Sequence, residues 1–177
     1  MKALRGTSLK RFLRDYRRAH SPTIEVVLVL QSVSYPVNVG ALFRIADASR
    51  VRRMILCGAT PTPPNPTIIK VGRDKHHNVP WEYEQRTEDA LLRMRTAGYY
   101  IVALEITDTA RPYYEVAYPD RVCLVLGNED HGVARSVLEL CDIAVFVPMY
   151  GQGQSLNVHV CAAVLLYHLL HTSLPNP

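Results

Sequence analysis

Residues 24–31 (IEVVLVLQ) constrain the fold of this chain more than any other segment, because they are a nearly continuous apolar run rich in β-branched side chains. Such a run is typical of a strand buried on both faces of a parallel sheet. Shorter apolar runs predict strands at residues 54–57, 99–104, 121–126 and 143–147, and helical spacing predicts helices at residues 38–49, 87–96, 133–141 and 155–170. This alternation predicts an α/β fold with an open, mainly parallel sheet and helices on both faces.

The size and composition of the chain predict a single domain. Its 177 residues, 48% of them hydrophobic, are enough for one substantial core, which we place at residues 21–177 with no separate substrate-recognition domain. No apolar run reaches the roughly 18 residues of a membrane span, and the first residues lack the apolar stretch of a secretory signal. These features predict a cytoplasmic protein that makes no contact with a membrane.

The sequence predicts no metal site. The four cysteines have no C-x-x-C spacing, which favours buried, reduced thiols. His76 and His77 are adjacent and lack companions at the spacing of metal ligands, so we expect them to lie in a solvated loop.

The first 20 residues carry most of the excess positive charge. They hold seven cations against one acid, which gives +6, and the net charge of +4 for the whole chain leaves −2 for the other 157 residues. A basic arm or helix of this kind commonly contacts phosphate, because each neutralised phosphate releases condensed counterions. We therefore predict that Arg11, Arg14 and Arg18 bind nucleic acid; the alternative is a solvated tail without a partner.

Polar side chains follow three of the predicted strands, in the loops that begin after Gln31, Leu126 and Val147. In open α/β folds, ligands bind beyond the carboxyl ends of the strands, so these loops predict one shared site. Taken singly, each feature also has an ordinary structural interpretation. Asn38 and Ser155 fit helix caps, Gly127, Gly151 and Gly153 fit tight turns, and Arg44 is spaced to pair with Asp47.

Three segments together carry a family resemblance. N-V-G-A-L-F-R-I-A-D-A (38–48), L-V-L-G-N-E-D-H-G-V (124–133) and V-P-M-Y-G-Q-G-Q-S-L-N-V-H-V-C-A-A-V (147–164) resemble the three ordered motifs of the SpoU/TrmH family of SPOUT RNA methyltransferases. The resemblance implies a C-terminal deep trefoil knot and a homodimer whose active site is completed across the subunit interface. It also implies that S-adenosylmethionine donates a methyl group to a ribose 2′-hydroxyl of RNA, without a metal.

The resemblance also assigns site residues. The catalytic or substrate-facing positions are Asn38, Arg44, Glu129, Ser155 and Asn157. The cofactor positions are Leu126, Gly127, Asn128, Val147, Met149, Gly151 and Leu156, where Gly127 and Gly151 let the chain approach closely. Arg44, as a guanidinium that keeps its proton, is expected to hold a phosphate and the developing oxyanion, with Asn38 orienting Arg44 or the ribose.

The chain departs from the family pattern at His159, where a small hydroxyl residue is commoner, and at Asp130 and His131 in the second motif. We expect none of these three to touch the matching polar positions.

Other functions remain open at this stage. Related SPOUT enzymes methylate guanine nitrogens of transfer RNA, and a non-catalytic RNA-binding dimer could keep the same fold. A nicotinamide dehydrogenase is disfavoured, because no G-x-G-x-x-G follows a strand. As the RNA partner we favour transfer RNA over ribosomal RNA.

Overall fold

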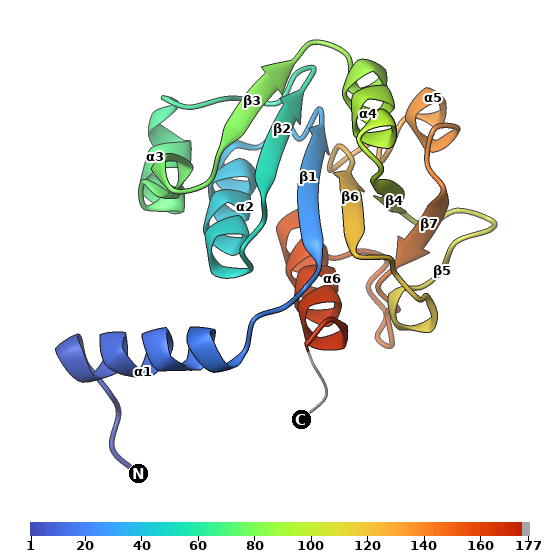
Figure 1. The fold of residues 1–177 in the computed structure, drawn as a ribbon. Helices are drawn as coiled ribbons and strands as arrows, with labels where there is room; N and C mark the ends of the chain where they lie inside the picture. Colours follow the sequence, from blue (N-terminus) through green and yellow to red (C-terminus); the bar gives the residue numbers. More distant parts are fainter. Residues whose placement is uncertain (175–177) are drawn as a thin grey trace.

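The computed structural model describes residues 1–174 and contains one seven-stranded sheet (Figure 1). The strand order is β3-β2-β1-β6-β4-β7-β5, and every pair of neighbours is parallel. The strands are β1 (Glu25–Gln31), β2 (Arg53–Cys57), β3 (Trp81–Glu84), β4 (Tyr100–Leu104), β5 (Arg111–Pro112), β6 (Arg121–Leu126) and β7 (Ile143–Phe146). The predicted parallel α/β sheet is therefore confirmed.

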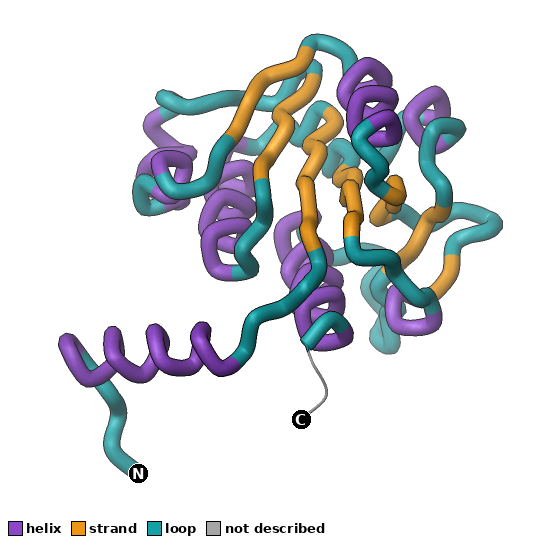
Figure 2. The backbone as a smooth tube through the Cα atoms, in the orientation of Figure 1, coloured by secondary structure: helices purple, strands orange, loops and turns teal. Residues whose placement is uncertain are grey.

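Helices cover both faces of the sheet (Figure 2). They are α2 (Pro36–Ala48), α3 (Pro66–Gly72), α4 (Thr87–Thr96), α5 (Arg135–Leu138) and α6 (Val158–Thr172). Alternate residues of β1 divide between two cores: Val26 and Leu28 pack with α2, α3 and α6, whereas Val27 and Val29 pack with α4 and α5. This division explains why β1 is apolar at every position, since successive side chains point to opposite faces and both faces are covered.

The basic arm forms a helix, α1 (Gly6–Ala19), that stands away from the rest of the chain (Figure 1). Each of its 14 residues is exposed. Leu9, Phe12, Leu13 and Tyr16 recur at helical spacing and form an apolar stripe, and the cations occupy the opposite side. An isolated helix of this length is marginal in water, and no residue of α1 is buried against the rest of residues 1–174.

Several short elements at the sheet edge were not predicted. No helix or strand was predicted within residues 66–84, yet they form α3, the 3₁₀ helix η1 (Lys75–His77) and β3. Pro66 begins α3, and the Asn65 side chain accepts hydrogen bonds from the backbone N–H groups of Thr67 and Ile68. β3 lies at the edge of the sheet and has only one neighbouring strand, so it can carry charged residues. Its sequence, WEYE, is therefore not an apolar run and was not predicted as a strand.

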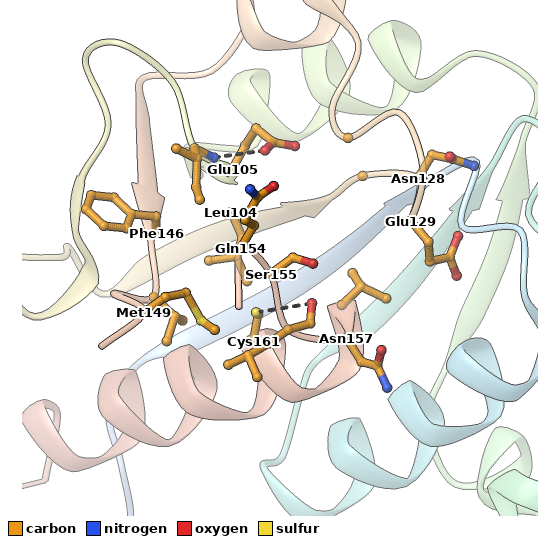
Figure 3. A pocket seen from close by; sticks show the side chains of 16 residues that line it. Leu104, Glu105, Asn128, Glu129, Phe146, Met149, Gln154, Ser155, Asn157 and Cys161 are labelled. Carbon is orange, nitrogen blue, oxygen red and sulfur yellow. Dashed lines mark hydrogen bonds between the residues drawn. The ribbon is translucent and has the colours of Figure 1, made fainter. Parts of the chain in front are cut away.

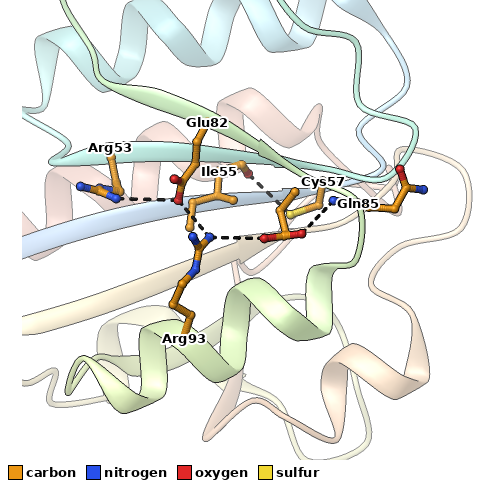
Figure 4. A network of polar contacts seen from close by, with 7 residues as sticks. Arg53, Ile55, Cys57, Glu82, Gln85 and Arg93 are labelled. Atoms are coloured by element: carbon orange, nitrogen blue, oxygen red, sulfur yellow. Dashed lines mark hydrogen bonds and ion pairs between the residues drawn. The ribbon is translucent and has the colours of Figure 1, made fainter.

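Charged side chains hold β3 to its neighbours (Figure 4). Glu82 on β3 pairs with Arg93 of α4 at 3.0 Å and with Arg53 of β2 at 3.7 Å. These pairs are partly exposed, and each contributes at most about 1 kcal/mol. They add to the packing of Trp81, which lies against the core beside Phe43 of α2.

Both helices that were expected to begin at a polar cap begin elsewhere. The helix expected from Asn38 begins at Pro36, which is pre-organised for the first helical turn, so Asn38 lies inside the helix and is not its cap. The helix expected from Ser155 begins at Val158, and Ser155 is not its cap either. Both polar side chains are therefore free of a capping role.

The trefoil knot stays a prediction.

No helix within residues 1–174 combines the length and the apolar character needed to cross a membrane.

Candidate functional site

A pocket of about 280 Å³ lies beyond the carboxyl ends of β4, β6 and β7 (Figure 3). Pockets that bind small molecules usually have volumes of roughly 300 Å³ or more, so this pocket lies near the lower end of that range. Its wall consists of Leu104, Glu105, Ile106, Gly127, Asn128, Glu129, Gly132, Phe146, Val147, Met149, Gln154, Ser155, Leu156, Asn157, Val158 and Cys161. The wall is therefore largely apolar, with two carboxylates and several amides placed on it.

The segment after β6 forms a tight turn at the pocket. Asn128 and Gly132 exchange backbone hydrogen bonds of 3.1 and 2.9 Å. A Cβ at Gly127 would overlap the backbone of Gly132 and Val133, so only glycine fits there. The Asn128 side chain accepts hydrogen bonds from the backbone N–H groups of Asp130 and His131, which closes the turn. These contacts define the shape of the second motif at the pocket.

Glu105 is the first residue after β4 and was not predicted. Its carboxylate accepts hydrogen bonds from the backbone N–H groups of Ile106 (2.9 Å) and Val133 (2.8 Å). It thereby joins the end of β4 to the turn after β6, on the wall of the pocket. Its position directly after a predicted strand could have indicated a site residue, but the site was predicted only in the loops after Gln31, Leu126 and Val147.

A chain of side-chain hydrogen bonds connects the three motifs. Asn38 is 8% exposed, and its Nδ2 donates to Glu129 Oε1 at 2.6 Å. Its Oδ1 lies 2.9 Å from His159 Nδ1 in the first turn of α6. Glu129 also accepts hydrogen bonds from the backbone N–H groups of Ser34 (2.8 Å) and Tyr35 (3.3 Å), directly before α2. This arrangement joins the loop after β1, the loop after β6 and the start of α6.

The expectation that His159 does not touch the matching polar positions is wrong. His159 contacts Asn38 directly, because the first turn of α6 faces α2 across the same layer of helices. The other two departures bind elsewhere: the backbone N–H groups of Asp130 and His131 donate to Asn128 Oδ1, which belongs to the predicted cofactor positions. Burial lowers the pKa of His159, which favours the neutral imidazole near pH 7.

Arg44 is exposed on α2 and lies apart from the pocket wall formed by residues 1–174. The ion pair with Asp47 that its spacing suggested is absent within the same residues. Asp47 instead pairs with Lys75 at 2.8 Å and accepts a hydrogen bond from Asn78 at 3.0 Å, because η1 packs beside α2. The expected contact between Asn38 and Arg44 is also absent there, since both ends of the Asn38 amide face other side chains.

The other predicted residues divide between the pocket and its surroundings. Glu129, Ser155 and Asn157 lie on the wall, as do the predicted cofactor positions Gly127, Asn128, Val147, Met149 and Leu156. Leu126 and Gly151 are outside the wall formed by residues 1–174. Leu126 is fully buried at the end of β6, and Gly151 is exposed in the loop after β7, where a Cβ would meet no described atom within 4 Å. Arg11, Arg14 and Arg18 lie on α1.

The cysteines and the adjacent histidines were also the subject of predictions. Within residues 1–174 the cysteines are free, and burial raises the pKa of Cys57 and of Cys141 to about 12, so both thiols stay protonated. His76 and His77 do have a companion, because Asp74 brings a carboxylate within 4.8 Å of a nitrogen of each. The chain turns sharply at Arg73 and Asp74, and this turn gathers the three residues.

Known proteins that are similar in sequence to this chain are RNA methyltransferases. The model of the SpoU rRNA methylase family matches residues 25–167. The 23S rRNA (guanosine(2553)-2′-O)-methyltransferase RlmP of Bacillus subtilis is 31% identical over 147 residues, which cover 83% of this chain and 58% of that protein. The tRNA (guanosine(18)-2′-O)-methyltransferase of Thermus thermophilus is 30% identical over 163 residues, which cover 92% of this chain and 82% of that protein.

Solved structures give the same result. The AdoMet-bound rRNA methyltransferase of Sinorhizobium meliloti has a TM-score of 0.79 at 25% identity, over 85% of this chain and 57% of that one. The TrmH/SpoU tRNA-modifying enzyme of A. aeolicus has a TM-score of 0.77 at 27% identity, over 92% of this chain and 82% of that one. The chain spans little more than half the length of the Bacillus and Sinorhizobium proteins.

Proposed function

Because the chain belongs to the SpoU rRNA methylase family, we propose that it is an S-adenosylmethionine-dependent enzyme that methylates a ribose 2′-hydroxyl of RNA. The observation that carries the proposal is the meeting of the three motifs. Glu129 lies on the pocket wall, binds Asn38 of the first motif, and shares the pocket with Ser155 and Asn157 of the third. The relatives that lend support are named as 2′-O-methyltransferases of ribosomal or transfer RNA.

The residues of the pocket fit S-adenosylmethionine. Leu104, Ile106, Val147, Met149 and Leu156 offer an apolar surface for an adenine ring. Gly127 carries no side chain, so it leaves backbone groups on the pocket wall open to the ligand. Glu105 and Glu129 bring carboxylates to a ligand that carries a sulfonium and an ammonium group. Structures of relatives with this cofactor bound support the same assignment.

The protein's part in the reaction is alignment and charge stabilisation. The cofactor supplies a methyl group that its sulfonium already activates. Holding the ribose oxygen in line with the S–C bond can lower the barrier by several kcal/mol. Ser155 and Asn157 face the pocket and position the ribose or pass its proton to water. Glu129 keeps the loop after β1 in place through the Ser34 and Tyr35 N–H groups.

Arg44 supplies the positive charge in this proposal. Its guanidinium forms no ion pair within residues 1–174, so it is available to hold a phosphate and the developing oxyanion. Because Arg44 lies away from its own pocket, it would reach the pocket of a second subunit. The homodimer predicted from the family resemblance supplies that second pocket.

The outer side of α6 supports the homodimer. This helix is largely apolar, yet only one side of it packs on the sheet. Val160 is 37% exposed and Tyr167 is 54% exposed on the other side. Val37, Ala41 and Arg44 share an outward face of the adjoining helix α2. A second copy that covers this apolar surface would also approach Arg44.

A methylation assay with nucleoside analysis tests the proposal. The protein is incubated with labelled S-adenosylmethionine and either transfer or ribosomal RNA, and the RNA is digested to nucleosides. We expect label in 2′-O-methyl nucleosides, with transfer RNA the better substrate. Label in a methylated guanine base would replace the ribose assignment. Absence of label together with absence of calorimetric S-adenosylmethionine binding would leave a non-catalytic RNA-binding dimer. The cytoplasmic location stays a prediction.

A further inference from the structure

His159 lies outside the set of residues that the three motifs assigned, yet it completes the hydrogen-bond chain through Asn38. The Asn38 amide is buried, and both of its ends have partners: Glu129 on the Nδ2 side and His159 on the Oδ1 side. A buried amide of this kind is held in one of two orientations, related by a half-turn that exchanges oxygen and nitrogen. The orientation therefore depends on what the two partners can donate or accept.

Glu129 decides the orientation. An ionised carboxylate only accepts hydrogen bonds, so it requires the Asn38 nitrogen on its side, at the observed 2.6 Å. The Asn38 oxygen must then face His159 Nδ1 at 2.9 Å, and a carbonyl oxygen only accepts. His159 Nδ1 must therefore carry a hydrogen. In the neutral ring this places the proton on Nδ1 and leaves Nε2 without one.

The place of His159 in the fold gives this contact a consequence at the pocket. His159 is two residues after Asn157, in the first turn of α6, and Leu156, Asn157 and Val158 line the pocket. Its bond to Asn38 ties this turn to α2. Through Asn38 and Glu129 the same chain reaches the N–H groups of Ser34 and Tyr35.

We infer that His159 is a positioning residue for the proposed methyl transfer. By donating from Nδ1 to Asn38 Oδ1, it fixes the Asn38 amide toward Glu129 and holds Asn157 at the pocket wall. The inference rests on the proposed function for its kinetic consequence only, because the hydrogen bond and the tautomer can be measured in any case.

Two substitutions separate the hydrogen bond from simple packing. His159→Asn keeps an N–H donor one bond from Cγ, where Nδ1 lies, whereas His159→Leu keeps comparable bulk without a donor. His77→Leu, at an exposed histidine in η1 that lies off the pocket wall and off α6, serves as the control for the loss of a histidine. The full-length chain is used for all three variants.

The first measurement is the tautomer. Two-bond proton–nitrogen NMR correlations of the wild-type chain should show His159 protonated at Nδ1 and unprotonated at Nε2 near neutral pH. The pattern should disappear in Asn38→Ala. A proton on Nε2 alone would overturn the inference, whether or not the protein methylates RNA.

The second measurement is the split between kcat and KM. His159→Leu should lower kcat by roughly ten- to a hundredfold, as expected when reacting groups are misplaced by about 1 Å, with little change in KM for RNA. His159→Asn should recover most of the loss, and His77→Leu should match wild type. Equal activity of the Leu and Asn variants would refute the role of the donor. If wild type proves inactive on every RNA, the calorimetric affinity for S-adenosylmethionine of the same variants gives the same comparison.

Discussion

Gly127 lies where the chain has no room for a side chain. A Cβ there would overlap the backbone of Gly132 and Val133, in the turn that forms one wall of the pocket. We predict that Gly127→Ala destabilises the fold by about 1–3 kcal/mol, because neighbouring backbone must move to relieve the overlap. Urea unfolding measures this change, and calorimetry should show that S-adenosylmethionine binding is lost.

Gly151 provides the matched control. Both glycines were expected to permit close approach, but a Cβ at Gly151 would contact no atom of residues 1–174 within 4 Å. Gly151→Ala should therefore change stability by no more than about 0.5 kcal/mol. Equal destabilisation by the two substitutions would contradict the steric explanation.

Glu105 combines a structural contact with a charge on the pocket wall. Glu105→Ala removes the acceptor for the N–H groups of Ile106 and Val133 and also a carboxylate that faces a cationic ligand. We predict roughly tenfold weaker binding of S-adenosylmethionine, since hydrogen bonds to charged groups are worth about 1.5–3 kcal/mol. Binding of the neutral-sulfur product, S-adenosylhomocysteine, should weaken less.

Calorimetric titration of both ligands checks the prediction for Glu105. Glu139→Ala removes an exposed carboxylate that pairs with Arg135 on α5, and it should leave both affinities unchanged. If Glu105→Ala binds both ligands as wild type does, the carboxylate plays no part in cofactor recognition.

The motifs predicted several of the polar residues on the pocket wall, but they did not predict the residues that hold these in place. Glu129, Ser155 and Asn157 lie on the wall, as a site at the strand ends requires. His159 and Glu105 escaped prediction because their importance depends on partners that are distant in sequence: His159 contacts a residue 121 positions away, and Glu105 a residue 28 positions away. No local pattern encodes such a pair.

At the scale of elements, burial on both faces decided which strands could be predicted. β1, β2, β4 and β6 are almost wholly apolar because helices cover both sides of them. At one edge, β3 gives no apolar signal because two of its four residues are glutamates. At the other edge, β5 has only two residues, which are too few for a pattern. The proline-rich segment before Pro66 likewise concealed α3, whose cap is formed by a single asparagine side chain.

The helix α1 makes an element-scale prediction about RNA. Its cations face away from the apolar stripe, and all of them are exposed. Replacing Arg11, Arg14 and Arg18 together by Gln should weaken RNA binding at low salt. It should also make the plot of the logarithm of the RNA association constant against the logarithm of the salt concentration less steep by about 2, since each phosphate contact to single-stranded RNA contributes roughly 0.7 to the slope.

Binding isotherms at several salt concentrations measure this slope. A triple replacement of Arg53, Arg93 and Arg95 by Gln removes equal charge from residues that are already paired with acids on the body of the protein. This control should leave the slope nearly unchanged. An unaltered slope in the α1 variant would show that α1 does not contact phosphate.

For the whole molecule, the decisive question is whether one chain contains a complete site. Asn38, Glu129 and His159 are joined within the chain, and Asn157 lies beside them at the pocket, but Arg44 faces outward from α2. The same side of the molecule exposes the apolar surface of α6. A two-fold dimer through this surface would bring Arg44 of each subunit to the pocket of the other, since such an interface uses the same patch twice.

Mixing two inactive variants tests this composite site. Arg44→Ala removes the charge that one subunit lends, and Asn157→Ala alters the pocket that receives it, so each pure variant should be inactive. After unfolding and refolding together, half of the dimers are mixed, and one of the two sites in each mixed dimer combines wild-type Arg44 with wild-type Asn157. Methylation should return to roughly a quarter of the wild-type rate for random pairing of two-fold dimers. A site contained in one chain would leave every mixture inactive, because each chain carries one of the two defects.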